Sequence, residues 1–215
     1  MKTIISVIGA VLLAGACSVA MAGENKMTAS FLTGLSIPVS GLYASNANTT
    51  GSRDDGMKAS LATAIAVDYQ LHESLALGLE VGHDWNHPVK EMPAGQDGDE
   101  ISLWQVTPYA KYSFQTIGKF TPYGILGLGL YSFHQNARNI GTTEMYAARN
   151  LNYLGFNIGG GATYALAKDW EIGLDLRWHH VFSGIQMSDL GNNSSSFISL
   201  NNLTPSVKVQ YGFSI

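Results

Sequence analysis

Hydrophobic and polar residues alternate along the last stretch of the chain. From Leu203 to Ile215 every second residue is apolar or aromatic, and the residues between them are polar or small. A period of two is the pattern of a β-strand with one apolar and one polar face. Segment 203–215 is therefore predicted to be a strand, and its place at the end of the sequence suggests that it pairs with the first strand.

The same alternation occurs seven more times before this segment. It predicts strands at 27–37, 58–69, 75–85, 103–114, 122–133, 153–164 and 170–182. Long connections are expected at 38–56, 86–100, 134–151 and 183–202, and short turns at 70–74, 115–119 and 165–169. The pattern predicts an all-β fold, an antiparallel up-and-down meander of eight strands that closes into a barrel. Its four long loops lie at one end and its three short turns at the other.

The two faces of the predicted strands differ in size. One face carries bulky apolar residues, and the other carries mostly glycine, alanine and serine with a few charges. Small residues make a poor exterior in water but suit the narrow interior of an eight-stranded barrel. The bulky face then needs lipid around it, and strands of this length suit a tilted span of about 9–11 residues. A soluble carrier barrel, with the bulky face inside, would need a charged exterior.

Aromatic residues gather at both ends of the predicted strands. The short-turn end has Tyr69, Tyr112, Phe114, Tyr164, Trp170, Tyr211 and Phe213. The long-loop end has Trp85, Trp104, Tyr131, Phe133, Tyr153 and Trp178. Two aromatic girdles around an aliphatic band are expected at the two interfaces of a membrane.

The composition fits a protein that is not surrounded by water. Charged residues are only 13% of the 215, against about 25% in a typical soluble domain. The net charge of −4 argues against a nucleic-acid partner, which usually meets a basic patch. After the leader, no apolar run reaches the ~20 residues that a transmembrane helix needs.

The first 22 residues have the pattern of a cleaved secretory signal peptide. Lys2 precedes an apolar run at 4–13, and Ala20-Met21-Ala22 forms a small-x-small cleavage site. The barrel domain would then comprise residues 23–215. Cys17 is the only cysteine and lies in the leader, so the mature chain would have no disulfide or thiol chemistry. A lipoprotein signal would instead make Cys17 the lipidated first residue.

Three segments carry a resemblance to a known family. They are Thr121-Pro122-Tyr123-Gly124-Ile125-Leu126-Gly127-Leu128-Gly129, Asp175-Leu176-Arg177-Trp178, and Thr204-Pro205-Ser206-Val207 with Tyr211-Gly212-Phe213. The mature chain resembles the small eight-stranded outer-membrane β-barrel proteins of Gram-negative bacteria, of the OmpX/OmpW-like and OmpA transmembrane type. The resemblance implies location in the outer membrane, extracellular long loops, periplasmic short turns, and a C-terminal strand read by the barrel-insertion machinery. The family usually ends on an aromatic residue, whereas here Phe213 is followed by Ser214-Ile215.

Charged residues on the small-residue face are the candidate site. The lumen is expected to hold Asp68, Glu80, Asp84, Lys111, Glu171, Asp175, Arg177 and Lys208. We interpret them as an internal network of ion pairs and hydrogen bonds, with a narrow polar conduit as the alternative. The six histidines show no metal-site spacing, and no cofactor is expected. Gly127, Gly129 and the run 159–161 are mid-strand residues for packing or bending rather than nucleotide loops.

These features predict a non-enzymatic, monomeric outer-membrane protein. Its loops would serve membrane integrity, adhesion or interaction, with membrane lipid, lipopolysaccharide or a host or surface ligand as partner. The alternative is an OmpW-like narrow channel for small or hydrophobic solutes. A lipid A-modifying hydrolase is less favoured, because the His-x-Ser pattern of such relatives is missing where His180 is followed by Val181-Phe182-Ser183.

Overall fold

The computed structural model describes residues 26–40, 57–88, 96–97, 100–140, 143–146, 148–186 and 197–214. The predicted leader with Cys17 lies outside these ranges, as do large parts of the predicted loops 38–56, 86–100 and 183–202 and three residues of 134–151. The described strands are β1 (Lys26–Ser40), β2 (Ser60–His72), β3 (Leu75–His87), β4 (Gln96–Asp97), β5 (Ile101–Ser113), β6 (Phe120–Gln135), β7 (Arg138–Ile140), β8 (Thr143–Tyr146), β9 (Arg149–Ala165), β10 (Trp170–Gln186) and β11 (Phe197–Ser214). In the described part of the chain, no helix is long and apolar enough to cross a membrane.

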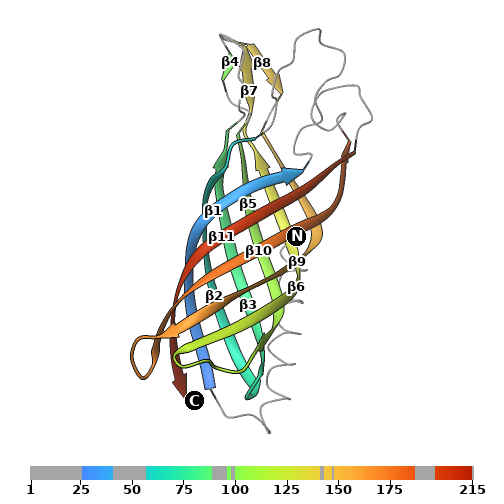
Figure 1. Cartoon of the computed structure of the whole chain (residues 1–215). Coiled ribbons are helices and arrows are strands. Elements are labelled where there is room, and N and C mark those ends of the chain that lie inside the picture. Colours follow the sequence, from blue (N-terminus) through green and yellow to red (C-terminus); the bar gives the residue numbers. More distant parts are fainter. Residues whose placement is uncertain are drawn as a thin grey trace.

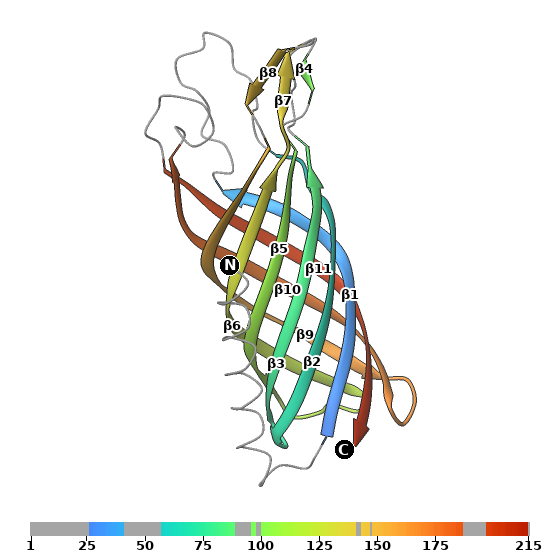
Figure 2. The same ribbon diagram turned by 180° about the vertical axis from the view of Figure 1, so that it is seen from behind.

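Eight of these strands form a closed barrel in the order β1-β11-β10-β9-β6-β5-β3-β2 (Figures 1 and 2). Every neighbouring pair is antiparallel, so the predicted eight-stranded up-and-down barrel is confirmed. Strands β1 and β11 close it, with a register that runs without a shift from Lys26↔Ser214 to Gly34↔Ser206. Closure satisfies the backbone groups of the first and last strands, which would otherwise be free edges.

The short connections lie together at one end of the barrel. Residues 73–74 join β2 to β3, residues 114–119 join β5 to β6, and residues 166–169 join β9 to β10. In the middle connection Ile117 and Phe120 exchange backbone hydrogen bonds of 2.8 and 3.1 Å. Gly118 sits between them at φ 65°, a left-handed conformation that glycine adopts without strain.

At the opposite end, called the loop end below, the strands are longer than the alternation predicts. Strand β11 begins at Phe197 rather than at residue 203, and β10 continues to Gln186. Segments 86–100 and 134–151, expected to be loops, also contain the three-stranded sheet β4-β7-β8. An alternating pattern needs two different solvents on the two faces of a sheet. In these additional segments the apolar and polar residues do not alternate regularly, so backbone pairing continues without that signal.

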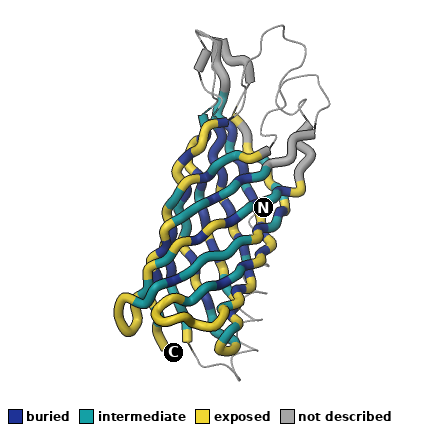
Figure 3. Tube along the Cα trace, in the orientation of Figure 1, coloured by how far each residue is buried: buried dark blue, intermediate teal, exposed yellow. Residues whose placement is uncertain are grey.

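The barrel wall separates a polar interior from an apolar exterior. On β3, Leu77, Leu79 and Val81 are 48%, 39% and 41% exposed, whereas Ala76 and Glu80 are 1% and 2% exposed. The same alternation of buried and exposed positions runs along the other barrel strands (Figure 3). The bulky apolar face therefore points outward. Soluble proteins rarely expose apolar surface over so large an area.

Replacing Leu174 with arginine tests this orientation. Leu174 is 67% exposed and lies on β10 midway between Trp170 and Trp178. An arginine there would place a charge in hydrocarbon, so the free energy of unfolding in lipid vesicles should fall by about 2–4 kcal/mol. The control Ile117→Arg lies in a short turn and should cost about 0–1 kcal/mol. Urea unfolding followed by tryptophan fluorescence measures both, and equal losses would contradict a lipid-facing Leu174.

Candidate functional site: the barrel interior

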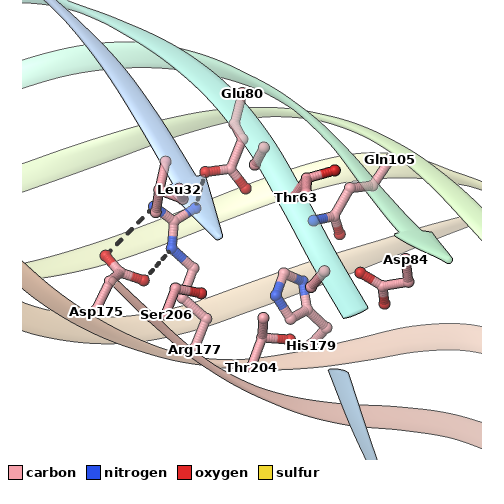
Figure 4. Close-up of a pocket in the computed structure, with 12 residues that line it drawn as sticks. Leu32, Thr63, Glu80, Asp84, Gln105, Asp175, Arg177, His179, Thr204 and Ser206 are labelled. Carbon is pink, nitrogen blue, oxygen red and sulfur yellow. Dashed lines mark hydrogen bonds and ion pairs between the residues drawn. The ribbon is translucent and has the colours of Figure 1, made fainter. Parts of the chain in front are cut away.

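Arg177 occupies the centre of the barrel interior. Its Nη1 lies 2.5 Å from Oε2 of Glu80, and its Nε lies 2.8 Å from Oδ1 of Asp175 (Figure 4). Its guanidinium carbon also lies 5.5 Å from the ring centroid of Tyr109, within the range of a cation–π contact. All four side chains are buried, and Arg177 is the cation in direct contact with both carboxylates, so it contributes most to compensating their charge.

A second ion pair lies nearer the short turns. The ammonium group of Lys111 contacts Asp68, and the hydroxyl of Tyr109 donates a hydrogen bond to the same carboxylate. Because the Tyr109 ring also faces Arg177, this tyrosine connects the two ion pairs across the lumen.

Tyr123 makes a parallel connection from strand β6. Its hydroxyl donates a 2.8 Å hydrogen bond to Oδ2 of Asp175. The ammonium nitrogens of Lys208 and Lys111 lie 4.1 and 5.9 Å from its ring centroid. The charged groups and the two tyrosines thus form one layer across the barrel, which we call the charged layer: Asp68, Glu80, Tyr109, Lys111, Tyr123, Asp175, Arg177 and Lys208.

Glycines on the inner face make room for this layer. A Cβ atom at Gly161 would lie 2.6 Å from the Tyr123 hydroxyl, and one at Gly78 would lie 2.3 Å from the Tyr109 ring. At Gly159 it would lie 2.9 Å from Cγ of Arg177. Each glycine is paired in register with the large residue that lies over it, Gly78 with Tyr109, Gly161 with Tyr123 and Gly159 with Arg177. These mid-strand glycines therefore allow large side chains from the adjacent strand to extend over them into the lumen, the packing role expected for Gly159 and Gly161.

A small polar cavity lies on the loop side of Arg177. Its volume is about 20 Å³ and its lining includes Glu80, Asp84, Arg177 and His179 (Figure 4). Asp84 accepts hydrogen bonds from Ser36 at 2.6 Å and from Asn202 at 3.2 Å, so it forms a contact group separate from the Arg177 ion pairs. The cavity is large enough for about one water molecule.

An apolar layer fills the interior at the loop end. It consists of Met57, Ile101, Leu103, Tyr131, Phe133 and Val181, and Leu151 and Tyr153 pack against it. Tyr131 and Phe133 were expected in the outer girdle, but they are 0% and 4% exposed inside the barrel. Both are odd-numbered residues of β6 and share the inner face with Gly127 and Gly129, so the parity of the strand decides their direction.

At the short-turn end the interior opens into a polar vestibule of about 550 Å³. Residues from both chain-end strands line it, together with Lys111 and Tyr123 of the charged layer. At this mouth Gln210 donates a 2.7 Å hydrogen bond to Oε2 of Glu171. Solvent at this end therefore reaches the charged layer but meets a filled cross-section there.

The structure brings most of the expected lumen residues into contact. Asp68, Glu80, Lys111, Asp175, Arg177 and Lys208 lie in or against one layer, whereas Asp84 lies on its loop side and Glu171 at its open mouth. Three interior residues were not among the expected lumen residues: Tyr109, Tyr123 and His179. The two tyrosines bind carboxylates, and Nδ1 of His179 shares a 3.2 Å hydrogen bond with the hydroxyl of Tyr131. Their positions in the strand alternation place all three on the inner face, so this signal could have identified them.

Tyr153, also expected in the outer girdle, has the inward parity of β9 and packs against the apolar layer. The remaining predicted aromatic residues lie at the outer wall. Most of them are clearly exposed: Trp85, Trp104, Tyr112, Phe114, Trp170, Tyr211 and Phe213. Tyr69, Tyr164 and Trp178 are half-buried. Several pack against each other, such as Tyr112 on Phe114 and Trp170 on Tyr211.

Comparison with known proteins decides the family. A sequence model of the outer membrane protein beta-barrel domain matches residues 8–213. The chain belongs to the outer membrane β-barrel family. No curated protein sequence matches it.

Solved outer membrane β-barrels share the fold at low sequence identity. Neisserial surface protein A is 13% identical, with a TM-score of 0.59 over 89% of this chain and 99% of that one. OprG from Pseudomonas aeruginosa is 13% identical, with a TM-score of 0.57 over 90% and 98%. Ail, the attachment invasion locus protein of Yersinia pestis, is 13% identical, with a TM-score of 0.52 over 88% and 99%. Another Ail structure contains the heparin analogue sucrose octasulfate.

Family membership and these barrels place this protein in the outer membrane. Among the described residues of this outer membrane β-barrel, no group of three or more His, Cys, Asp or Glu is placed to hold a metal ion.

Replacing Arg177 with methionine should strongly destabilise the barrel. Glu80 and Asp175 would remain buried without their direct ion-pair partner, which should cost about 3–5 kcal/mol of unfolding free energy. Adding Glu80→Gln and Asp175→Asn should restore much of that loss, because the unpaired charges are then gone. Lys168→Met, in the exposed β9–β10 turn, is the control and should change stability by less than about 0.5 kcal/mol. Urea unfolding in vesicles measures all three, and a loss that the added changes do not reduce would contradict the charge argument.

Proposed function

We propose that this protein is a non-enzymatic outer-membrane barrel whose role is carried out at its loop end, in membrane integrity or adhesion. The observation that carries the proposal is that the interior is filled at two levels. The charged layer closes the middle, and the apolar layer of Met57, Ile101, Leu103, Tyr131, Phe133 and Val181 closes the loop end. Because the described part of the lumen is filled at these two levels, the long loops on a rigid barrel are the parts available for recognition.

The relatives are consistent with a surface role. One of the solved structures is an attachment invasion locus protein and another is a surface protein. At 13% identity they support the fold, and the function is argued here from the filled interior. We propose that the loop end faces the outside and that the short-turn vestibule faces the periplasm, as expected from the family.

The alternative is a narrow channel for small or hydrophobic solutes. The vestibule of about 550 Å³ favours it, because one mouth of the barrel is open. A solute entering there would have to separate Lys111 from Asp68 and then pass Arg177, which is held by Glu80 and Asp175. It would next have to pass the apolar layer. Two such different barriers in series favour a closed barrel.

Conductance in planar bilayers separates the two functions. Wild-type protein is expected to give no steady current. Opening one layer alone, by Tyr131→Ala with Phe133→Ala or by Glu80→Ala with Arg177→Ala, should also give none, because the other layer remains. The four changes together should give a steady current. Heat-modifiable gel mobility would verify that each variant is folded, and a steady wild-type current would support the channel instead.

Deletions within the long loops test the surface role. A variant lacking residues 43–54 and another lacking 188–195 keep every described barrel strand, so both should still insert and show heat-modifiable mobility. Cells carrying them in place of wild-type protein should lose attachment to surfaces or resistance to detergent by about tenfold. A deletion of residues 167–168 in a short turn is the matched control and should keep the wild-type phenotype. Wild-type behaviour of both loop variants would contradict a role at these loops.

A further inference from the structure

Three histidines stand out on the lipid-facing wall: His83 on β3, His134 on β6 and His180 on β10. Strand alternation places each on the outer face, since His83 lies between Val81 and Trp85, His180 lies between Trp178 and Phe182, and His134 has the parity of Leu130. Among the described side chains of the barrel strands, the outward positions carry no Asp, Glu, Lys or Arg. An ionisable side chain in a membrane-facing wall is costly and calls for a functional explanation.

The three imidazoles share one hydrogen-bonding arrangement. Nδ1 of His83 lies 3.1 Å from the carbonyl oxygen of Leu103, Nδ1 of His134 lies 2.7 Å from Oδ1 of Asn150, and Nδ1 of His180 lies 2.5 Å from Oδ1 of Asn201. These oxygens only accept, so Nδ1 carries the proton in each neutral ring and Nε2 has the lone pair. A second proton would therefore bind at Nε2, leaving a donor that no described residue uses.

The aromatic neighbours locate two of these rings at the membrane interface. His83 packs between Trp85 and Trp104, at centroid distances of 4.8 and 4.3 Å. His180 packs against Phe156, Trp178 and Phe182 at 5.3 to 5.6 Å. Tryptophan marks the level of the lipid head groups.

The neighbouring strands offer these histidines no carboxylate at their paired positions. His83 is paired with Thr63 and Trp104, His134 with Ser102 and Asn150, and His180 with Phe156 and Asn201. Asp84 follows His83 but points into the lumen. Glu100 lies nearby at the loop end, where Asn86 and Asn136 donate hydrogen bonds to its Oε2.

The histidines occupy every second strand of one side of the barrel. In the order β10-β9-β6-β5-β3, they lie on β10, β6 and β3, all toward the loop end. Neighbouring strands are about 4.8 Å apart, so the three form an arc over five strands. The arc is not level, because His83 and His180 are in register with Ser132 and Leu128 of β6, and His134 lies nearer the loops than both. On β11, β1 and β2 the described outward side chains include no histidine other than His72 at the short-turn end of β2.

We propose that His83, His134 and His180 form a contact arc for the phosphate groups of anionic lipids in the leaflet at the loop end, and that the contact strengthens as pH falls. Histidine is the side chain that gains a proton between neutral and mildly acidic pH. Each added Nε2 proton would provide a charge-assisted donor at the depth of the lipid phosphates. The proposal rests on the membrane-embedded fold and is independent of whether the lumen conducts.

Imidazole titration in lipid nanodiscs tests the proposal. The barrel, labelled with ¹⁵N-histidine, is titrated by NMR in phosphatidylcholine discs and in discs that contain phosphatidylglycerol. The titration midpoints of the three histidines should rise by about one pH unit in the anionic discs. His72, exposed at the short-turn end, reports the general effect of surface potential and should rise less. Equal rises for His72 and the arc would overturn the proposal.

Two further measurements separate the arc from other causes. Spin-labelled phosphatidylglycerol should associate with the wild-type barrel about threefold more strongly at pH 5.5 than at pH 7.5, the size expected for weak charge-assisted contacts. His83→Gln, His134→Gln and His180→Gln together should remove this pH dependence, while the control His72→Gln should keep it. A triple variant with unchanged pH dependence would overturn the proposal. So would an equal midpoint rise when inorganic phosphate is added to phosphatidylcholine discs, because a soluble anion would then suffice.

Discussion

In hydrocarbon, every backbone N–H and C=O of a strand must find its partner within the protein, because no water is present to replace it. Most of the structure depends on this constraint. It requires β1 to pair with β11 without a gap from Lys26 to Gly34, and it sets the antiparallel neighbour relations of all eight strands. The closed wall then fixes which alternate residues face lipid and which face the lumen. The two faces consequently have separate solvents and separate compositions.

Closure with only eight strands leaves an interior about as wide as side chains are long. In that space a charge without a partner would be costly, and the chain combines its ion pairs with tyrosines that cross the lumen. Tyr109 and Tyr123 reach over Gly78 and Gly161 to bind carboxylates that belong to other strands. Glycine and tyrosine on the inner face are therefore complementary parts of one layer, and a Cβ at either glycine would displace the tyrosine that binds the carboxylate on the next strand.

The two ends of the barrel have different chemistry, inside and outside. The short-turn end has a polar vestibule inside and tyrosines in its outer girdle, whereas the loop end has an apolar layer inside and histidines among tryptophans outside. Outer membrane β-barrels only 13% identical to this chain share its wall. The same barrel wall satisfies the requirements of the membrane in all of them. Differences in function therefore depend on the side chains in the lumen, the side chains at the ends of the outer wall, and the loops.

The sequence by itself determined the strand number, the meander and the outward direction of the bulky face, because alternation with a period of two directly reports two different solvents. It also placed the charged residues on the inner face. It did not determine that β11 starts at Phe197, or that β4, β7 and β8 pair above the barrel, because the residues of these segments do not alternate regularly. Only the tertiary structure decided that Arg177 pairs with Glu80, 97 positions away, and that Tyr131 and Phe133 close the lumen. Such contacts depend on the tilt and register of the closed barrel, and no local pattern in the sequence encodes these.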